Sequence, residues 1–408
     1  MCPGGPQYSR TMQCSRMTAV PSHRLIPRLR PFASTIFAEM TELAARTGAV
    51  NLGQGFPDTE GPPGMLEVAR SAIAGGHNQY PPGSGIHELR TAVAEHQASR
   101  YGLVHDPDTE VLITVGATEA ISAALLALVQ QGDEVLLVEP YYDSYAAVVA
   151  LAGAQRRCVP LCAEGDRFAL DLDALAAAIT PATRALLLNS PHNPTGAVLR
   201  RSELAGIAAL AVEHDLLVIT DEVYEHLVFD AAQHLPIATF PGMEQRTLCV
   251  SSAGKTFSVT GWKIGWVCGP AHLVEAVRAV KQYLTFVAGA PFQPAVAHAL
   301  RAEQAWVAAQ CAALQDKRRR LATGLRTAGF GVHRSEGTYF ICADVRPLGY
   351  SDGLRFCREL PAQAGVVAVP VGVFADDAGP WRHLVRFAFC KRDEVLDEAI
   401  DRLVSARL

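Results

Sequence analysis

Residues 251–266 read SSAGKTFSVTGWKIGW, and this stretch sets two lysines, Lys255 and Lys263, among small and apolar residues. The tripeptide GKT at 254–256 looks like the end of a phosphate-binding P-loop. That loop requires another glycine five residues earlier, where this chain has Cys249. The nucleotide interpretation therefore fails, and the two lysines need another explanation.

Around this stretch, continuous aliphatic runs alternate with helical segments. The expected strands are EVLITV (110–115), EVLLVE (134–139), RALLLNS (184–190), LLVITDE (216–222), RTLCVSS (246–252) and KIGWVCG (263–269). Apolar strands between helices are typical of a parallel sheet that is buried on both faces. The sequence therefore predicts an α/β fold.

The two ends of the chain have a different pattern. The first thirty residues are rich in Pro, Ser and Arg and lack periodicity, which indicates a flexible extension with Met17 as an alternative start. After Pro270, long helices and short strands indicate a smaller α+β domain. We expect four parts: the extension 1–30, a segment 31–63 that packs with the small domain, a large domain 64–299 and the small domain 300–408.

Composition excludes several classes of protein. The 408 residues carry a net charge of −5, which argues against nucleic acid as a partner. No apolar run reaches the roughly 18 residues of a membrane span, and no secretory signal is evident. We therefore expect a cytoplasmic protein.

Metal ligands are not expected either. The ten cysteines are scattered and fit reduced, buried thiols better than disulfides. Cys158 and Cys162 have no second pair or histidine at zinc-site spacing. The thirteen histidines are dispersed along the chain, so no metal site is proposed.

Four polar clusters lie at expected strand ends. They are VGATEA (115–120), NSPHNPTG (189–196), DEVYE (221–225) and SSAGK (251–255). Each has a plain alternative: a helix cap, a turn, a solvated strand end and a surface lysine. Because ligands bind beyond the carboxyl ends of such strands, we expect the four clusters to meet at one site.

Together the clusters suit one ligand. An amine held among apolar neighbours loses solvation and forms imines with carbonyl groups, which is the chemistry expected of Lys255. An aldehyde cofactor with an aromatic nitrogen needs a carboxylate such as Asp221. The phosphate of such a cofactor would be bound by Gly116, Ala117, Thr118, Ser252 and Lys263. Its phenolic oxygen would accept hydrogen bonds from Asn193 and Tyr224. Its ring would stack on Tyr142. This inventory fits pyridoxal 5′-phosphate (PLP).

The chain resembles the class I aminotransferases of PLP fold type I. The resemblance rests on LGQGFPD, NQYPPGSG, VGATEAI, EPYYDSY, NSPHNPTG, TDEVYEHLVFD, SSAGKTFSVTGWKIGWVCGP and LVRFAFCK, in this order. It extends from about residue 30 to the C-terminus and is nearest to the kynurenine/glutamine and N-succinyldiaminopimelate aminotransferases. It implies a large PLP-binding domain with a mostly parallel sheet sandwiched by helices, and a smaller α+β domain.

The resemblance also assigns roles. Lys255 is similar to the Schiff-base lysine and general base, Asp221 to the partner of the pyridine nitrogen, and Tyr224 with Asn193 to the donors to the phenolic oxygen. The Gly116–Thr118 turn, Ser252 and Lys263 match the phosphate site. A cis bond before Pro194 is implied as well.

Four further residues are expected at the site outside the strand ends. Tyr80, in NQYPP, matches a tyrosine that reaches a neighbouring subunit's cofactor phosphate, which implies a homodimer. Arg386 matches the arginine that holds the substrate carboxylate, with a structural ion pair as the alternative. Gly55 matches a segment that lines the substrate site, or is only a tight turn. Phe37 is expected on an apolar wall or in the core.

The substrate is harder to read. The resemblance favours N-succinyl-LL-diaminopimelate with 2-oxoglutarate, in lysine biosynthesis. Kynurenine, glutamine or methionine transamination remains an alternative, with cysteine-conjugate β-lyase activity on the side. The apolar stretch 281–295, with Phe286 and Phe292, would suit an aromatic or thioether substrate or a dimer interface.

Two other classes of protein fit the sequence less well. A PLP-binding transcription regulator needs a basic helix-turn-helix module of some 60 residues, which the N-terminal extension is too short to hold. A lyase that does not transaminate would leave no pyridoxamine phosphate after an amino donor is added alone.

Overall fold

The computed structural model of the chain describes residues 24–406 and residue 408, and its larger sheet has eight strands in the order β2-β9-β8-β7-β6-β3-β4-β5. These strands are β2 (Val111–Thr114), β3 (Glu134–Glu139), β4 (Gln155–Glu164), β5 (Arg167–Leu170), β6 (Thr183–Asn189), β7 (Leu217–Asp221), β8 (Thr247–Ser252) and β9 (Gly265–Cys268). Every strand predicted between residues 110 and 269 is confirmed.

Most of this sheet is parallel, as predicted. β4, β3, β6, β7 and β8 run in the same direction, whereas β9 lies antiparallel between β8 and β2. The hairpin of β4 and β5 was not predicted. Most side chains of β4 are exposed or half-buried, so this strand, next to the edge strand β5, lacks the continuous apolar run of a central strand.

Successive residues of the central strands are buried on opposite faces of the sheet. In β3, Val135 and Leu137 pack under α4 (Gly116–Leu128), α5 (Asp143–Leu151) and α9 (Ala271–Lys281). Leu136 and Val138 pack on the other face with α6 (Leu172–Ala178) and α7 (Arg201–Glu213). A third apolar cluster, at the β2–β9 end of the sheet, contains α2 (Pro63–Ala74), α3 (His87–Tyr101) and α10 (Phe292–Ala302).

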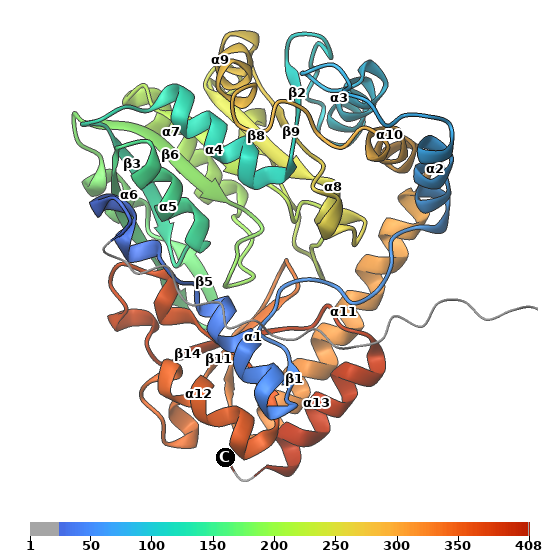
Figure 1. Cartoon of the computed structure of the whole chain (residues 1–408). Coiled ribbons are helices and arrows are strands. Elements are labelled where there is room, and N and C mark those ends of the chain that lie inside the picture. Colours follow the sequence, from blue (N-terminus) through green and yellow to red (C-terminus); the bar gives the residue numbers. More distant parts are fainter. Residues whose placement is uncertain (1–23, 407) are drawn as a thin grey trace, which may run out of the picture.

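The smaller sheet is antiparallel and lies below the larger one in Figure 1. Its order is β10-β11-β14-β13, from β10 (Gly331–Val332), β11 (Phe340–Asp344), β13 (Val369–Pro370) and β14 (Leu384–Ala388). It packs with α11 (Gln304–Thr327), α12 (Gly353–Ala364) and α13 (Asp393–Ser405). This agrees with the α+β pattern expected of the C-terminal region.

The N-terminal segment packs with the C-terminal region and forms a separate two-stranded sheet there. β1 (Val50–Asn51) pairs in parallel with β12 (Val366–Val367), and α1 (Ile36–Thr47) packs against α12. Residues 52–62 then cross toward α2, so the chain passes between the two sheets in Figure 1.

The expected extension 1–30 falls largely outside the described residues. Its last residues form a 3₁₀ helix, Pro27–Phe32, that packs against α5. The two prolines of this helix carry the φ angle that such a turn requires, and the irregular composition had hidden it. Within the described ranges, no helix is both long and apolar enough to cross a bilayer.

Candidate active site

A cavity of about 350 Å³ opens at the carboxyl edge of the larger sheet, beside β14 of the smaller one. This volume is in the usual range for a small-molecule site. Every site residue predicted from the sequence lines it except Tyr80; these are Phe37, Gly55, Gly116, Ala117, Thr118, Tyr142, Asn193, Asp221, Tyr224, Ser252, Lys255, Lys263 and Arg386. The four strand-end clusters therefore meet, as expected.

Lys255 lies in the short helix α8 (Ala253–Thr256), directly after β8. Its Nζ donates a hydrogen bond to the Tyr339 hydroxyl at 2.9 Å and lies 5.8 Å from the centre of the Tyr224 ring. Desolvation lowers the pKa of Lys255 to about 8, although Asp221 acts in the opposite direction. Near neutral pH this amine is still mostly protonated, but its unprotonated fraction is far larger than that of an ordinary lysine.

Asp221 ends β7 and is almost completely buried. The Tyr145 hydroxyl donates to its Oδ2 at 2.6 Å, and the Val223 amide donates to Oδ1 at 3.3 Å. Burial raises the pKa of Asp221 to about 6, and the hydrogen bond from Tyr145 opposes that rise. The carboxylate is therefore held in its ionised form by a residue that the sequence analysis did not include.

Asn193 stands between the two halves of the site. Its backbone amide donates to Asn189 Oδ1 at 2.7 Å, and Asn189 Nδ2 donates to the Asp221 carbonyl at 2.8 Å. The Asn193–Pro194 peptide bond is cis, as predicted. The side-chain oxygen of Asn193 accepts a hydrogen bond from Arg386 Nη1 at 2.9 Å.

Arg386, in β14, is a fully buried cation with neutral partners. Besides Asn193, its guanidinium donates to the Gly53 carbonyl at 2.9 Å, and its Nε has no partner among the described residues. The guanidinium carbon lies 3.9 Å from the centre of the Phe340 ring, with Phe37 and Phe374 within 5.5 Å. Burial lowers the pKa of Arg386, and the structural ion pair considered as an alternative is not what these contacts form.

A second cation, Lys263, lies over the start of α4. A Cβ built on Gly116 would lie 3.2 Å from Lys263 Nζ, and one on Gly265 would lie 2.7 Å from the Gly116 carbonyl carbon. The close approach of β9 thus depends on Gly265 and brings an ammonium group to the N-terminus of a helix. Free backbone N–H groups at a helix N-terminus and a nearby ammonium group together favour the binding of an anion.

The two predicted tyrosines differ in their surroundings. Tyr224 is buried after β7, with its ring edge-on to Tyr339 at 5.2 Å, and burial raises its pKa. Tyr142 precedes α5 and packs edge-on against Tyr145 at 5.7 Å; burial raises its pKa to about 12. Both phenols are therefore neutral at physiological pH.

Tyr80 is 82% exposed and lies outside the cavity of its own chain. Its ring packs edge-on against the exposed Phe286, with 5.4 Å between the ring centres. Lys281 connects the loop that contains Tyr80 with the loop that contains Phe286, because its Nζ donates to the Gly83 and Phe286 carbonyls. Phe292 stacks on Trp262 at 4.7 Å. Neither phenylalanine of the stretch 281–295 lines the cavity, so the substrate-wall interpretation is not supported within this chain.

Several residues of the site were not singled out in the sequence, although three of them lie within quoted motifs. They are Gln54, Tyr145, Asn189, Tyr339 and Phe340. Tyr145 follows Tyr142 by three positions, which places the two on one helix face, and this spacing could have identified it. Asn189 ends β6 and the pair Tyr339–Phe340 stands at the start of β11, but only the fold brings them to Asp221 and Lys255.

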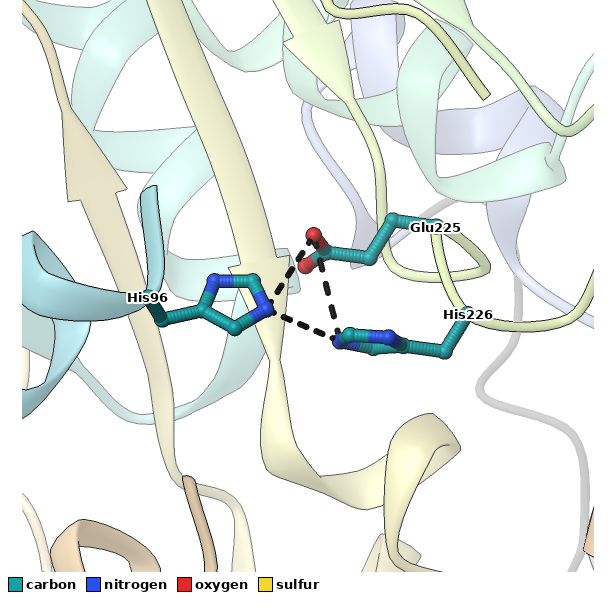
Figure 2. A group of neighbouring side chains, drawn as sticks. All are labelled: His96, Glu225 and His226. Carbon is teal, nitrogen blue, oxygen red and sulfur yellow. Dashed lines mark hydrogen bonds and ion pairs between the residues drawn. The ribbon is translucent and has the colours of Figure 1, made fainter. Parts of the chain in front are cut away.

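A separate polar cluster lies behind the site, and the dispersed histidines did not predict it. It contains His96 of α3 with Glu225 and His226 after β7, and we call it the histidine cluster (Figure 2). The two Nε2 atoms are 3.1 Å apart and lie 3.9 and 4.0 Å from Glu225 Oε2. Sequence separation of 130 positions explains why no motif revealed it.

The histidine cluster is held by hydrogen bonds. Tyr101 and Ser251 hydroxyls donate to the two oxygens of Glu225 at 2.6 and 2.5 Å. Burial opposes ionisation of Glu225, yet the nearby histidines and Ser251 bring its pKa down to about 2. A metal-bound histidine usually donates its other N–H to an acceptor, whereas neither Nδ1 here has a partner in the described chain. The contacts fit an internal network better than a metal centre.

Comparison with known proteins identifies the family. The model of the family "Aminotransferase class I and II" matches residues 47–403. The "Probable N-succinyldiaminopimelate aminotransferase DapC" of Mycobacterium tuberculosis is 62% identical over 386 residues, covering 93% of this chain and 97% of that protein. The methionine aminotransferase of Escherichia coli is 39% identical, covering 93% and 98%.

Solved structures agree. The structure of N-succinyldiaminopimelate aminotransferase from Mycobacterium tuberculosis superposes with a TM-score of 0.92 at 63% identity, covering 93% of this chain and 99% of that one. Class I enzymes of this fold depend on PLP, which the cavity residues suit. The chain therefore belongs to the class I and II aminotransferases and is a PLP-dependent enzyme that acts on amino and 2-oxo acids.

Proposed function

We propose that this enzyme transfers the amino group of N-succinyl-LL-diaminopimelate to 2-oxoglutarate, a step of lysine biosynthesis. The proposal is supported by 62% identity to a protein of that name, along nearly the whole chain. The observation that carries the site assignment is Arg386, a buried cation that faces the cavity and whose acceptors in the described part of the chain are neutral.

Arg386 is the group that we assign to the substrate α-carboxylate. Burying a charge without a counterion is costly, and both acceptors of this guanidinium are neutral. A carboxylate in the cavity would accept two parallel hydrogen bonds from it. Such a bidentate contact fixes the orientation of the Cα–H bond.

The cavity residues fit the cofactor that the family requires. The glycine at 116 leaves Lys263 Nζ close to the helix N-terminus, a cradle that a larger side chain would fill. We assign the phosphate to Gly116, Ala117, Thr118, Ser252 and Lys263. Asn193 and Tyr224 would contact the phenolic oxygen, and Tyr142 would lie against the ring.

Two ionisable groups would carry the chemistry. When bound, PLP supplies an aldehyde that condenses with amines and a ring that accepts electrons. Lys255, with its depressed pKa, would hold that aldehyde and later move a proton from the substrate Cα. Asp221, held ionised by Tyr145, would keep the ring nitrogen protonated.

A panel of amino donors tests the substrate assignment. Each donor is supplied with 2-oxoglutarate, and kcat/KM is compared for N-succinyl-LL-diaminopimelate, methionine, kynurenine and glutamine. We expect the succinylated donor to lead by about 10²-fold, because each matched polar contact contributes to the transition state. A higher kcat/KM for methionine or kynurenine would overturn the assignment.

The second candidate is transamination of methionine, kynurenine or glutamine with β-lyase activity on cysteine conjugates. It is favoured by the aromatic side chains of Phe37, Tyr142 and Phe340 on the cavity wall, which suit an apolar substrate. The same donor panel decides between the two, and release of pyruvate from a cysteine conjugate measures the β-lyase reaction.

We also propose that the enzyme is a cytoplasmic homodimer with large and small domains at 64–299 and 300–408. Tyr80 and Phe286 form an exposed aromatic pair beside loops tied by Lys281. Such a pair suits a second copy, in which Tyr80 would reach the partner's phosphate site. Sedimentation of Tyr80→Asp beside the wild type tests this, and a wild-type monomer would contradict it.

A further inference from the structure

We propose that Tyr339 is a positioning residue for Lys255, whose free amine it holds by accepting a hydrogen bond from Nζ. The inference rests on the proposed role of Lys255 as the lysine that binds the cofactor. It assigns a function to a side chain that neither the sequence motifs nor the cavity lining revealed.

The hydrogen bonds around Tyr339 have only one consistent direction. Lys255 Nζ and the Gly55 carbonyl oxygen lie 2.9 and 2.6 Å from the same hydroxyl. A carbonyl only accepts, so the single phenol proton goes to Gly55. Toward Lys255 the hydroxyl therefore presents a lone pair, and the lone pair of the amine stays free to accept a proton.

Tyr339 is fixed in place and remains neutral. It is 1% exposed, and its ring packs edge-on against Tyr224 at 5.2 Å and Phe340 at 4.8 Å. Burial raises the pKa of Tyr339 well above its ordinary value, so the hydroxyl is a hydrogen-bonding group rather than a base.

The backbone before Tyr339 is strained. Thr338 has a φ of +66°, a left-handed conformation that β-branched residues rarely adopt. It is held there by its amide, which donates to the Leu227 carbonyl at 2.9 Å, and by its own Oγ1, which accepts from the Phe340 amide at 3.1 Å. Strain of this kind persists where the surroundings demand one orientation, and here it aims Tyr339 at the lysine.

The same turn also contacts the segment that meets Arg386. A Cβ on Gly55 would lie 2.5 Å from Phe340 Cζ, so the segment approaches Tyr339 and Phe340 only because residue 55 is glycine. Two residues earlier, the Gly53 carbonyl accepts from Arg386. Tyr339 therefore ties the lysine to the backbone beside the carboxylate site.

The test compares Tyr339→Phe with the wild type, first without cofactor. Competitive acylation over a range of pH, read out by mass spectrometry of the Lys255 peptide, gives the protonation midpoint of this amine. Loss of the acceptor removes a contact that favours the ammonium form, so we expect the midpoint to fall by about 0.5 to 1 pH unit. An unchanged midpoint would overturn the proposal.

The loaded enzyme gives a second readout. We expect kcat of Tyr339→Phe to fall about 10-fold with KM for the donor nearly unchanged, because the substrate site is intact while the base is less well placed. The isotope effect with α-deuterated donor should rise. Equal kcat and equal isotope effect would contradict the positioning role.

Two controls separate the possible failures. Tyr350→Phe removes a hydroxyl that donates to Glu359 at 3.0 Å, away from the cavity, and should leave the Lys255 midpoint unchanged. Borohydride reduction of the loaded wild type should label Lys255. A label elsewhere would refute the role of Lys255, whereas a label at Lys255 with an unchanged Tyr339→Phe midpoint would refute only the role of Tyr339.

Discussion

The cavity and the histidine cluster are two buried polar regions on either side of β8, and they balance charge in different ways. In the cavity, Arg386 has neutral acceptors and Lys263 faces a helix N-terminus. In the histidine cluster, the Glu225 carboxylate receives two hydroxyl groups and lies beside two histidines (Figure 2). Burial lowers the pKa of both histidines, that of His226 to about 3, so Glu225 is held mainly by the two hydroxyl donors. Both regions shift pKa values, but the charges of the cavity face open volume, whereas that of Glu225 is enclosed by its hydrogen-bond donors.

This difference separates a binding site from a structural network. A shifted pKa reports burial, which both regions share. An uncompensated charge that faces open volume reports a missing ligand, and the carboxylate and phosphate groups expected here are both anions. Variants of residues in the two regions test this distinction.

Lys255→Ala should show the largest effect. We expect kcat to fall by at least about 10⁴-fold, because both the attachment point and the proton carrier are lost. Lys255→Arg keeps the charge and should be equally inactive, since a guanidinium does not form the imine. Steady-state kinetics measure the loss, and wild-type-like turnover by either variant would refute the assignment.

Asp221→Asn and Glu225→Gln should separate activity from stability. We expect Asp221→Asn to lower kcat/KM by about 10³-fold, whereas Glu225→Gln should keep most activity but lose about 2 kcal/mol of stability. The side-chain oxygen of glutamine can accept a hydrogen bond from one of the two hydroxyl donors. Its NH₂ group, which only donates, would then face the other hydroxyl. Comparable losses of activity in both variants would erase the distinction between the regions.

The pH dependence of apoenzyme unfolding should differ in sign for the same two carboxylates. The pKa of Asp221 is raised to about 6 in the folded protein. Its contribution to the free energy of unfolding is therefore most favourable below its ordinary pKa and is lost as pH rises through 6. The pKa of Glu225 is lowered to about 2, so its contribution is present at neutral pH and lost as pH falls toward 2. Urea titrations at several pH values give the free energy of unfolding as a function of pH. The slope due to Asp221 should be flatter in Asp221→Asn, and the slope due to Glu225 should be flatter in Glu225→Gln.

Arg386→Gln should lower kcat/KM by about 10²-fold without loss of stability, because it removes a buried cation that no anion compensates. Arg318→Gln is the matched control. Arg318 is also buried but donates to Asp230 Oδ2 at 2.6 Å, so its loss should destabilise the fold and spare kcat/KM. Thermal unfolding measures the stability of both variants, and steady-state kinetics measure their kcat/KM. A strongly destabilised Arg386→Gln would count against the substrate role of Arg386.

Tyr145→Phe should have the smallest effect. Without the hydroxyl that donates to Asp221, we expect the acid limb of the kcat/KM profile to move upward by about 0.5 pH unit. At pH 8 the variant should approach wild-type activity. A profile identical to that of the wild type would show that Tyr145 only packs beside Tyr142.

The fold could be predicted because its strands carry their own signal. Runs such as EVLLVE and LLVITDE have a continuous apolar centre and end in polar residues. The structure confirms them as β3 and β7. The strand β4, next to the edge of the sheet, was missed because exposed side chains interrupt its apolar pattern. A strand that faces solvent has little to distinguish it from a loop.

The meeting of the candidate residues in one cavity was predictable where they follow a strand end and hidden where it depends on contacts across the chain. Lys255 and Asp221 could be named from local sequence. Tyr339 lies 84 positions from Lys255, and His96 lies 130 from His226. No local pattern encodes such a meeting, because only packing of the whole chain creates it.

The connection from β8 to β9 carries both site lysines, and this has a consequence for how the protein can change. The antiparallel pairing of the two strands fixes the ends of this short loop, with Ser252 opposite Gly265. Inserting or deleting a residue between positions 253 and 264 would shift one amine relative to the other. New substrate preferences are therefore more readily acquired through the segment around Gly55 and the walls from the smaller sheet, which can vary while this loop keeps its length.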